Sequence, residues 1–221
     1  MNINYLIIET IICLTAIILV YYKYKTNGLY GYLIIETILS NIMSLKTIDI
    51  NNFSLNLGLI PFLCLFLISN IIIQKKGKEE IKKIIVLILA ISVISYIIFL
   101  LSCKLESSTI NLFTNKSFDN IFLNSARIYF ANIVTTLYML FLNSNIYYYL
   151  KKQKNMIWIS NIFSNIIVQF LATIIFVLLA YVITTDTIEI IGKIIVRYLI
   201  SIIVTSIGTI TIYITNTIKE K

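Results

Sequence analysis

The chain has 221 residues, of which 59% are hydrophobic and only 13% are charged, and its mean hydropathy is +0.93. This composition excludes an ordinary soluble domain, because a soluble core of this length needs far fewer apolar residues. The net charge of +8 does not indicate nucleic-acid binding, since the lysines lie in short loops between apolar runs. Histidine is absent, and neither a nucleophile with its base nor a phosphate-binding loop is found, so an enzyme is the least favoured class.

Seven apolar segments follow one another and predict an all-α bundle of membrane-spanning helices. In chain order they are residues 4–22, 29–45, 57–74, 83–103, 122–150, 159–183 and 191–215. The first segment lacks the basic start and the cleavage site of a signal peptide, so we expect a retained N-terminal helix. The fifth is long enough to begin as a surface helix, and six spans are the alternative count. We therefore expect one integral membrane domain over residues 1–221.

The distribution of basic residues predicts the orientation of the chain. Loops that follow even-numbered segments have only Lys46, Lys104, Lys116, Arg127 and Lys193 near them. The positive-inside rule then predicts an outside N-terminus and a cytoplasmic C-terminus in a bacterial cytoplasmic membrane. The remaining loops and the C-terminus carry 12 of the 18 basic residues, namely Lys23, Lys25, Lys75, Lys76, Lys78, Lys82, Lys83, Lys151, Lys152, Lys154, Lys219 and Lys221.

Three cysteines, Cys13, Cys64 and Cys103, lie far apart in the chain, each in or at the edge of an apolar run. Their odd number and wide spacing predict neither a disulfide framework nor a metal site. We therefore expect cysteines that only fill space in the bundle, with no metal and no cofactor.

Two acidic side chains, Glu9 and Glu36, lie inside apolar segments, where an ionisable group costs at least about 2.5 kcal/mol. Each could stay protonated and bond a neighbouring helix, or exchange a proton during transport, so both are candidates for proton coupling. Arg127 opens the inner part of the fifth segment, and Arg197 lies within the seventh. We expect one of these arginines to pair with a glutamate.

Amides and hydroxyls also lie at membrane depth. An amide offers a donor and an acceptor together, which suits the edge of a neutral heterocycle, although the same groups also bond helices to one another. The candidate solute-binding residues are Asn41, Asn70, Gln74, Arg127, Asn143, Gln169 and Thr173.

Four sequence motifs are spaced along the chain. They are GLYGYLIIETILSNIMSLK at 28–46, FLISNIIIQKKG at 66–77, ARIYFANIVTTLYMLFLNSNIYYYLK at 126–151 and MIWISNIFSNIIVQFLAT at 156–173. Their order and spacing, within residues 24–215, resemble the queuosine precursor transporter family, also called the VUT family. The resemblance implies a six- or seven-helix inner-membrane protein that takes up 7-deazaguanine precursors of the tRNA base queuosine.

The chain departs from the family pattern in one direction, because charged positions have become neutral. Two positions that are basic in the family are Ser160 and Ser201 here. Loss of both partners of a buried pair retains a fold without retaining a function, so the departures weaken the inference about the substrate. The positions that are acidic in the family are Asn70, Gln74, Asn143, Ala172 and Gly208 here.

The leading hypothesis is a secondary transporter for a small neutral heterocycle, bound at mid-membrane by Asn70, Gln74, Asn143 and Gln169. A transport-incompetent paralogue or accessory subunit that binds another membrane protein is the second hypothesis. The substrate-binding subunit of an energy-coupling-factor vitamin importer is the third. A homo-oligomer is compatible with each of these hypotheses.

Overall fold

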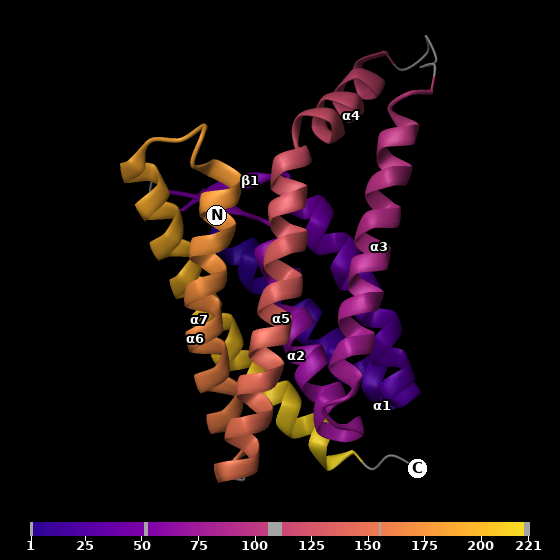
Figure 1. Ribbon diagram of the computed structural model, residues 1–221, viewed down its shortest axis with the longest axis vertical. Coiled ribbons are helices and arrows are strands. Elements are labelled where there is room, and N and C mark those ends of the chain that lie inside the picture. The colour runs from indigo at the N-terminus through magenta and orange to yellow at the C-terminus, as the bar shows by residue number, and fades with distance from the viewer. Residues whose placement is uncertain (1, 51–52, 106–111, 155, 219–221) are drawn as a thin grey trace.

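The computed structural model describes residues 2–50, 53–105, 112–154 and 156–218. Within them the chain is a bundle of long helices with one small β-hairpin (Figure 1). The elements are α1 (Asn2–Met43), β1 (Thr47–Ile50), β2 (Phe53–Asn56), α2 (Leu59–Lys76), α3 (Glu80–Ser102), α4 (Leu112–Asn124), α5 (Ala126–Lys154), α6 (Ile157–Tyr181) and α7 (Thr187–Thr217).

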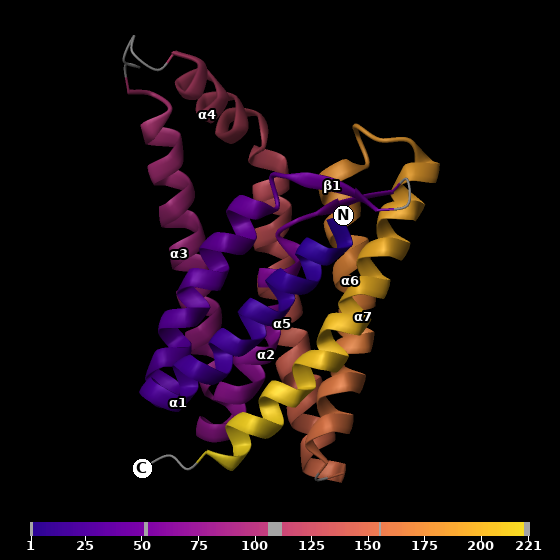
Figure 2. The same cartoon turned by 180° about the vertical axis from the view of Figure 1, so that it is seen from behind.

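The first helix, α1, folds back on itself at Lys25, whose φ of 54° and ψ of −148° lie outside the helical region. Both views show the two arms of α1 running in opposite directions (Figure 1, Figure 2). The arms pack together, and the hydroxyl of Tyr32 in the second arm donates to the carbonyl of Cys13 in the first at 3.4 Å. These arms correspond to the two segments predicted at 4–22 and 29–45.

Five helices of the described chain are long and apolar enough to cross a membrane, counting α1 once. The count is six if α4 and α5, which meet at a bend of 51°, together form one broken span. The long segment predicted at 122–150 is thus two helices, with the break between Asn124 and Ala126. The prediction of an all-α membrane bundle is confirmed.

The helix α2 lies at the centre of the bundle, and 83% of its most apolar stretch is buried. Every residue from Leu59 to Ile73 is buried, as expected for a helix surrounded by others. The outer helix α3 is the opposite case, because only 17% of its apolar stretch is buried. Its exposed apolar side chains are suited to lipid contact.

The β-hairpin was not predicted from the sequence. Its strands pair antiparallel with Thr47 opposite Asn56 and Ile50 opposite Phe53. The side-chain amide of Asn56 donates to the carbonyl of Ser44 at 2.7 Å and to the hydroxyl of Tyr181 at 2.5 Å. These bonds fasten the hairpin across one end of the bundle, next to the start of α7 (Figure 2).

The two ends of the bundle differ in their connections. The turn of α1, the α2–α3 connection and the α5–α6 connection lie at one end, and the β-hairpin, α4 and the α6–α7 connection lie at the other (Figure 1). The loops that the sequence analysis identified as lysine-rich therefore share one end, as the positive-inside prediction requires. Lys219 and Lys221 lie outside the described residues.

Candidate functional site

A polar side chain buried in a membrane bundle needs a partner, because lipid offers no hydrogen bonds. Four helices, α2, α5, α6 and α7, bring such side chains together at their centre. We call this group the asparagine cluster, and its members are all buried: Asn70, Asn143, Asn161, Asn165 and Thr209.

The cluster is a chain of hydrogen bonds between helices. The amide of Asn143 on α5 donates to Asn70 on α2 at 2.9 Å, and Asn70 donates to Asn161 on α6 at 2.8 Å. Asn161 in turn donates to the hydroxyl of Thr209 on α7 at 2.8 Å, and Asn165 donates to Asn161 at 3.0 Å. Every amide nitrogen in the cluster is therefore used within the protein.

Gln74 lies one turn beyond Asn70 on α2. It accepts a hydrogen bond from the hydroxyl of Tyr147 at 3.1 Å and donates to Asn216 at 2.8 Å. The structure thus brings Asn70 and Asn143 together but gives Gln74 a separate set of partners near the lysine-rich end.

Asn41 belongs to a different network on the other side of the bundle. It donates to the hydroxyl of Ser92 on α3 at 3.0 Å and accepts from the amide of Asn132 on α5 at 2.8 Å. Asn132 also donates to Ser40 at 3.1 Å. This network joins the second arm of α1 to α3 and α5.

A second polar region runs along the contact between α6 and α7. Buried polar residues occur at every fourth position of both helices, and the Asn161–Thr209 bond sets their antiparallel register. Four-residue spacing keeps them on one face of each helix. We call this region the polar ladder. Counted in steps of four residues from the Asn161–Thr209 bond, its expected facing pairs are Asn165 with Thr205, Gln169 with Ser201, and Thr173 with Arg197.

The two sides of the polar ladder are bonded differently. On α7 the hydroxyls of Ser201, Thr205 and Thr209 each donate to the carbonyl four residues earlier in the same helix. On α6, the amide nitrogen and oxygen of Gln169 and the hydroxyl of Thr173 all lack a hydrogen-bond partner among the described residues. The ladder is therefore bonded at Asn161 and open from Gln169 onward.

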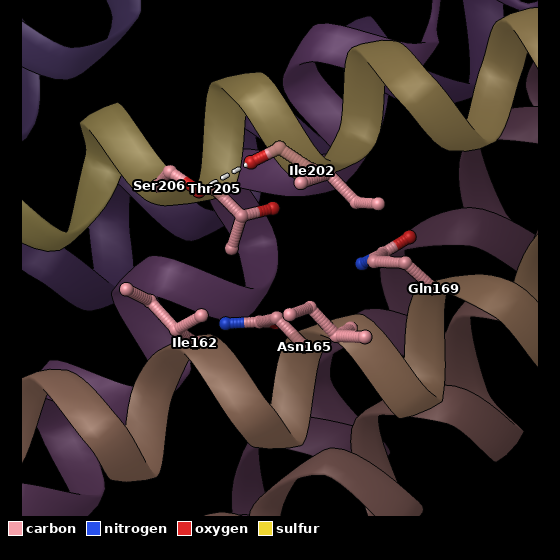
Figure 3. A pocket seen from close by; sticks show the side chains of 7 residues that line it. Ile162, Asn165, Gln169, Ile202, Thr205 and Ser206 are labelled. Atoms are coloured by element: carbon pink, nitrogen blue, oxygen red, sulfur yellow. Dashed lines mark hydrogen bonds between the residues drawn. The ribbon is translucent and has the colours of Figure 1, made fainter.

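A narrow crevice between α6 and α7 exposes part of this ladder. Asn165 and Gln169 point into it from α6 and Thr205 from α7, and the hydroxyl of Ser206 is tied to the carbonyl of Ile202 at 2.7 Å (Figure 3). The crevice has no room for a water-sized molecule. In this conformation the two helices are closed on the unpaired groups.

The two arginines differ from expectation. Arg127, at the start of α5, donates to the hydroxyl of Thr184 at 2.8 Å, away from the asparagine cluster. Arg197 is only 2% exposed and lies over the ring of Phe176, with its guanidinium carbon 4.2 Å from the ring centre. The prediction that one arginine pairs with a glutamate is wrong, because the ion pairs within the described chain are Lys83–Glu80 and Lys193–Glu189.

The two glutamates lie in a separate place, where the arms of α1 meet α2. The thiols of Cys13 and Cys64 and a carboxyl oxygen of Glu36 lie within 4.8 Å of one another, and all three residues are buried. Neither oxygen of Glu36 has a hydrogen-bond partner among the residues that the structure describes, and Glu9 is half-buried one turn from Cys13. The cysteines were predicted only to fill space, yet three helical arms assemble a set of side chains that could share one cation.

Sequence reasoning identified Asn70, Asn143, Gln169 and Thr173 but did not foresee how α6 and α7 face each other. Asn165 and Thr205 were missed as members of the site. The recurrence of polar residues at every fourth position in both helices was the available signal, and it needed the register between the helices to become informative.

Comparison with known proteins agrees with this architecture. Residues 56–215 match the family described as "Putative vitamin uptake transporter". Neither a curated protein nor a solved structure shows a significant match to the chain. The family match covers α2 to α7, which carry the asparagine cluster and the polar ladder. The chain is a multi-pass membrane protein that belongs to the vitamin uptake transporter family.

Proposed function

We propose that this protein takes up a small heterocycle, of the 7-deazaguanine queuosine-precursor type or a related nucleobase or vitamin, by secondary transport. The solute would cross between α6 and α7 in a bacterial cytoplasmic membrane, with the lysine-rich end of the bundle facing the cytoplasm. The family supports uptake of a small molecule.

One observation carries the proposal: the amide of Gln169 is buried at membrane depth with both its nitrogen and its oxygen unpaired among the described residues. An unpaired buried polar group costs about 1 to 3 kcal/mol, so a folded protein rarely retains one without a use. The amide presents a donor and an acceptor side by side. The neutral edge of a heterocyclic ring carries the complementary acceptor and donor, so the two can form a pair of hydrogen bonds.

The closed crevice supports an alternating-access mechanism. Solute entry requires α6 and α7 to separate, since the crevice now admits nothing. Gln169 and Thr173 would then bind the ring edge. Asn70 and Asn143 would position α6 through Asn161 and act indirectly on the solute. Glu9 and Glu36 remain candidates for carrying a coupling proton.

The experiment is a supply test in a bacterium that can neither make nor import queuosine precursors. The full chain is expressed, its insertion in the membrane is checked, and queuosine in tRNA is measured after each precursor is supplied outside. We expect queuosine to appear and to fall at least about tenfold with Gln169→Ala. The matched control is Thr15→Ala, whose exposed hydroxyl bonds only to carbonyls of its own helix.

A transport-incompetent paralogue or accessory subunit is the second candidate, and the asparagine cluster favours it, because every amide nitrogen there is already bonded within the protein. Absence of queuosine with every precursor, in cells where the inserted protein is verified, would reject the proposed substrate. A partner would then be sought by cross-linking in the membrane.

A further inference from the structure

Arg197 is a buried cation that forms no ion pair within the described part of the chain. Its side chain lies inside the bundle, 2% exposed, and both terminal nitrogens lack a hydrogen-bond partner among the described residues. An arginine cannot shed its proton to escape burial. A buried charge that lacks a partner is strongly destabilising, so this guanidinium requires an anion, and the described residues do not supply one.

The surroundings of Arg197 define what kind of anion fits. Its guanidinium carbon lies 4.2 Å from the ring centre of Phe176 on α6 and 5.4 Å from that of Phe62 on α2. Both rings lie against the guanidinium, and Nη1 and Nη2 have no hydrogen-bond partner among the described residues. A planar group with two oxygens is the partner that matches a guanidinium edge with two parallel hydrogen bonds.

The location of Arg197 links this edge to the solute path. In the antiparallel register of the polar ladder, Arg197 is expected to face Thr173, and Thr173 lies one helical turn, about 6 Å along the axis, from Gln169. The hydroxyl of Thr173 is also unpaired among the described residues. A solute that binds Gln169 and Thr173 along α6 would therefore extend toward Arg197.

We propose that Arg197 binds a carboxylate carried by the transported heterocycle, whose ring edge Gln169 and Thr173 bind. The inference rests on the proposed function for the solute path and adds the substrate class: heterocyclic carboxylates rather than uncharged heterocycles. A lipid phosphate is disfavoured as the occupant, because Arg197 lies between α2, α6 and α7 rather than on the lipid-facing surface.

The test compares matched ligand pairs on the full chain purified in detergent. The pairs are 7-deazaguanine with a 7-carboxylate against its 7-carboxamide, and pyridine-3-carboxylate against its carboxamide. Affinity is taken from the rise in thermal unfolding temperature with ligand concentration. We expect the carboxylate of at least one pair to bind about ten- to a hundredfold more tightly than its carboxamide, as a charge-assisted pair provides.

Variants of the two cations on α7 make the test specific. Arg197→Met should abolish the carboxylate preference, and Arg197→Lys should retain part of it, which also covers the case in which the Met variant does not fold. Lys193→Met is the control, because Lys193 lies one turn away on α7 but pairs with Glu189 and Ser54. That variant should retain the full preference.

Three outcomes would overturn the proposal: equal affinity within both pairs, a preference that survives Arg197→Met, or stabilisation by acetate or chloride alone that equals that by the heterocyclic acids. The last result would assign Arg197 to a resident small anion. Failure of the proposed function looks different. If no precursor yields queuosine in tRNA while the carboxylate preference depends on Arg197, the anion site stands and the queuosine assignment falls.

Discussion

The asparagine cluster and the open part of the polar ladder lie on the same helix, α6, and are built from the same kinds of side chain. In the cluster every amide nitrogen donates to another helix or to its own. Two turns along α6, Gln169 has no partner at all among the described residues. The difference teaches that buried amides in a membrane bundle have two uses. Amides that are hydrogen-bonded within the protein hold helices together, whereas an amide without a partner is a candidate for binding the solute.

The largest effect is expected where the cluster is broken. Asn161→Ala removes the side-chain bonds that join α6 to Asn70 on α2 and to Thr209 on α7, and it leaves the buried amide nitrogen of Asn70 without its acceptor. We expect a loss of about 3 kcal/mol in the free energy of unfolding. Denaturant titration of the protein in mixed micelles measures it, and a loss below about 1 kcal/mol would contradict the structural role of the cluster.

A steric change provides a reference that touches neither polar region. At Gly58 an added Cβ would meet the backbone of Ser40 and Ser44, where α2 begins against the end of α1. Gly58→Ala should cost about 2 kcal/mol, as overpacking against backbone does. Gly31→Ala is the control, because an added Cβ there meets nothing. If both variants unfold alike, the close approach at Gly58 is not real.

Gln169→Leu should reverse the pattern seen at Asn161. The unpaired amide gains nothing from folding, so the free energy of unfolding should stay the same or rise by about 1 kcal/mol. Uptake, measured as queuosine in tRNA, should fall at least about tenfold. A variant that unfolds as readily as Asn161→Ala would show that Gln169 is a structural amide, and the contrast between the two regions would be lost.

The smallest effect is expected at the turn of α1. Lys25 has a positive φ that suits glycine, so Lys25→Gly should relieve about 1 kcal/mol of backbone strain and raise the unfolding temperature without changing uptake. Lys23→Gly, two residues away within the helix, should instead lower it, because glycine weakens a helix interior. Equal effects at both positions would argue against the turn.

The helices could be predicted from the sequence because apolar length alone requires them in a membrane. The β-hairpin could not be predicted, because its two strands have only four residues each and are of mixed polarity. Its position depends on hydrogen bonds from Asn56 to Ser44 and Tyr181, which are distant contacts in the fold. Asn70 and Asn143 were identified by type and depth. Their direct bond depends on how α2 and α5 rotate, which no spacing within one helix reveals.

The arginine–glutamate expectation failed for a related reason. Glu36 faces Cys13 and Cys64 where α1 meets α2, and Arg197 is held between the rings of Phe62 and Phe176. Opposite charges at membrane depth attract only if the helices that carry them turn the right faces together. Residue type and depth were enough to single out Glu36 and Arg197 as ionisable groups inside the membrane. Their partners depend on helix packing, which the sequence does not reveal.

The hydroxyls of α7 that bond back to their own helix have a mechanical consequence. Such bonds loosen the carbonyl ladder and bend helices, and they can be exchanged for other acceptors with only a side-chain rotation. Ser201, Thr205 and Thr209 occur in series at the crevice. We therefore expect α7 to be the helix that bends when the passage between α6 and α7 opens. The asparagine cluster should hold α6 in place at the centre of the bundle.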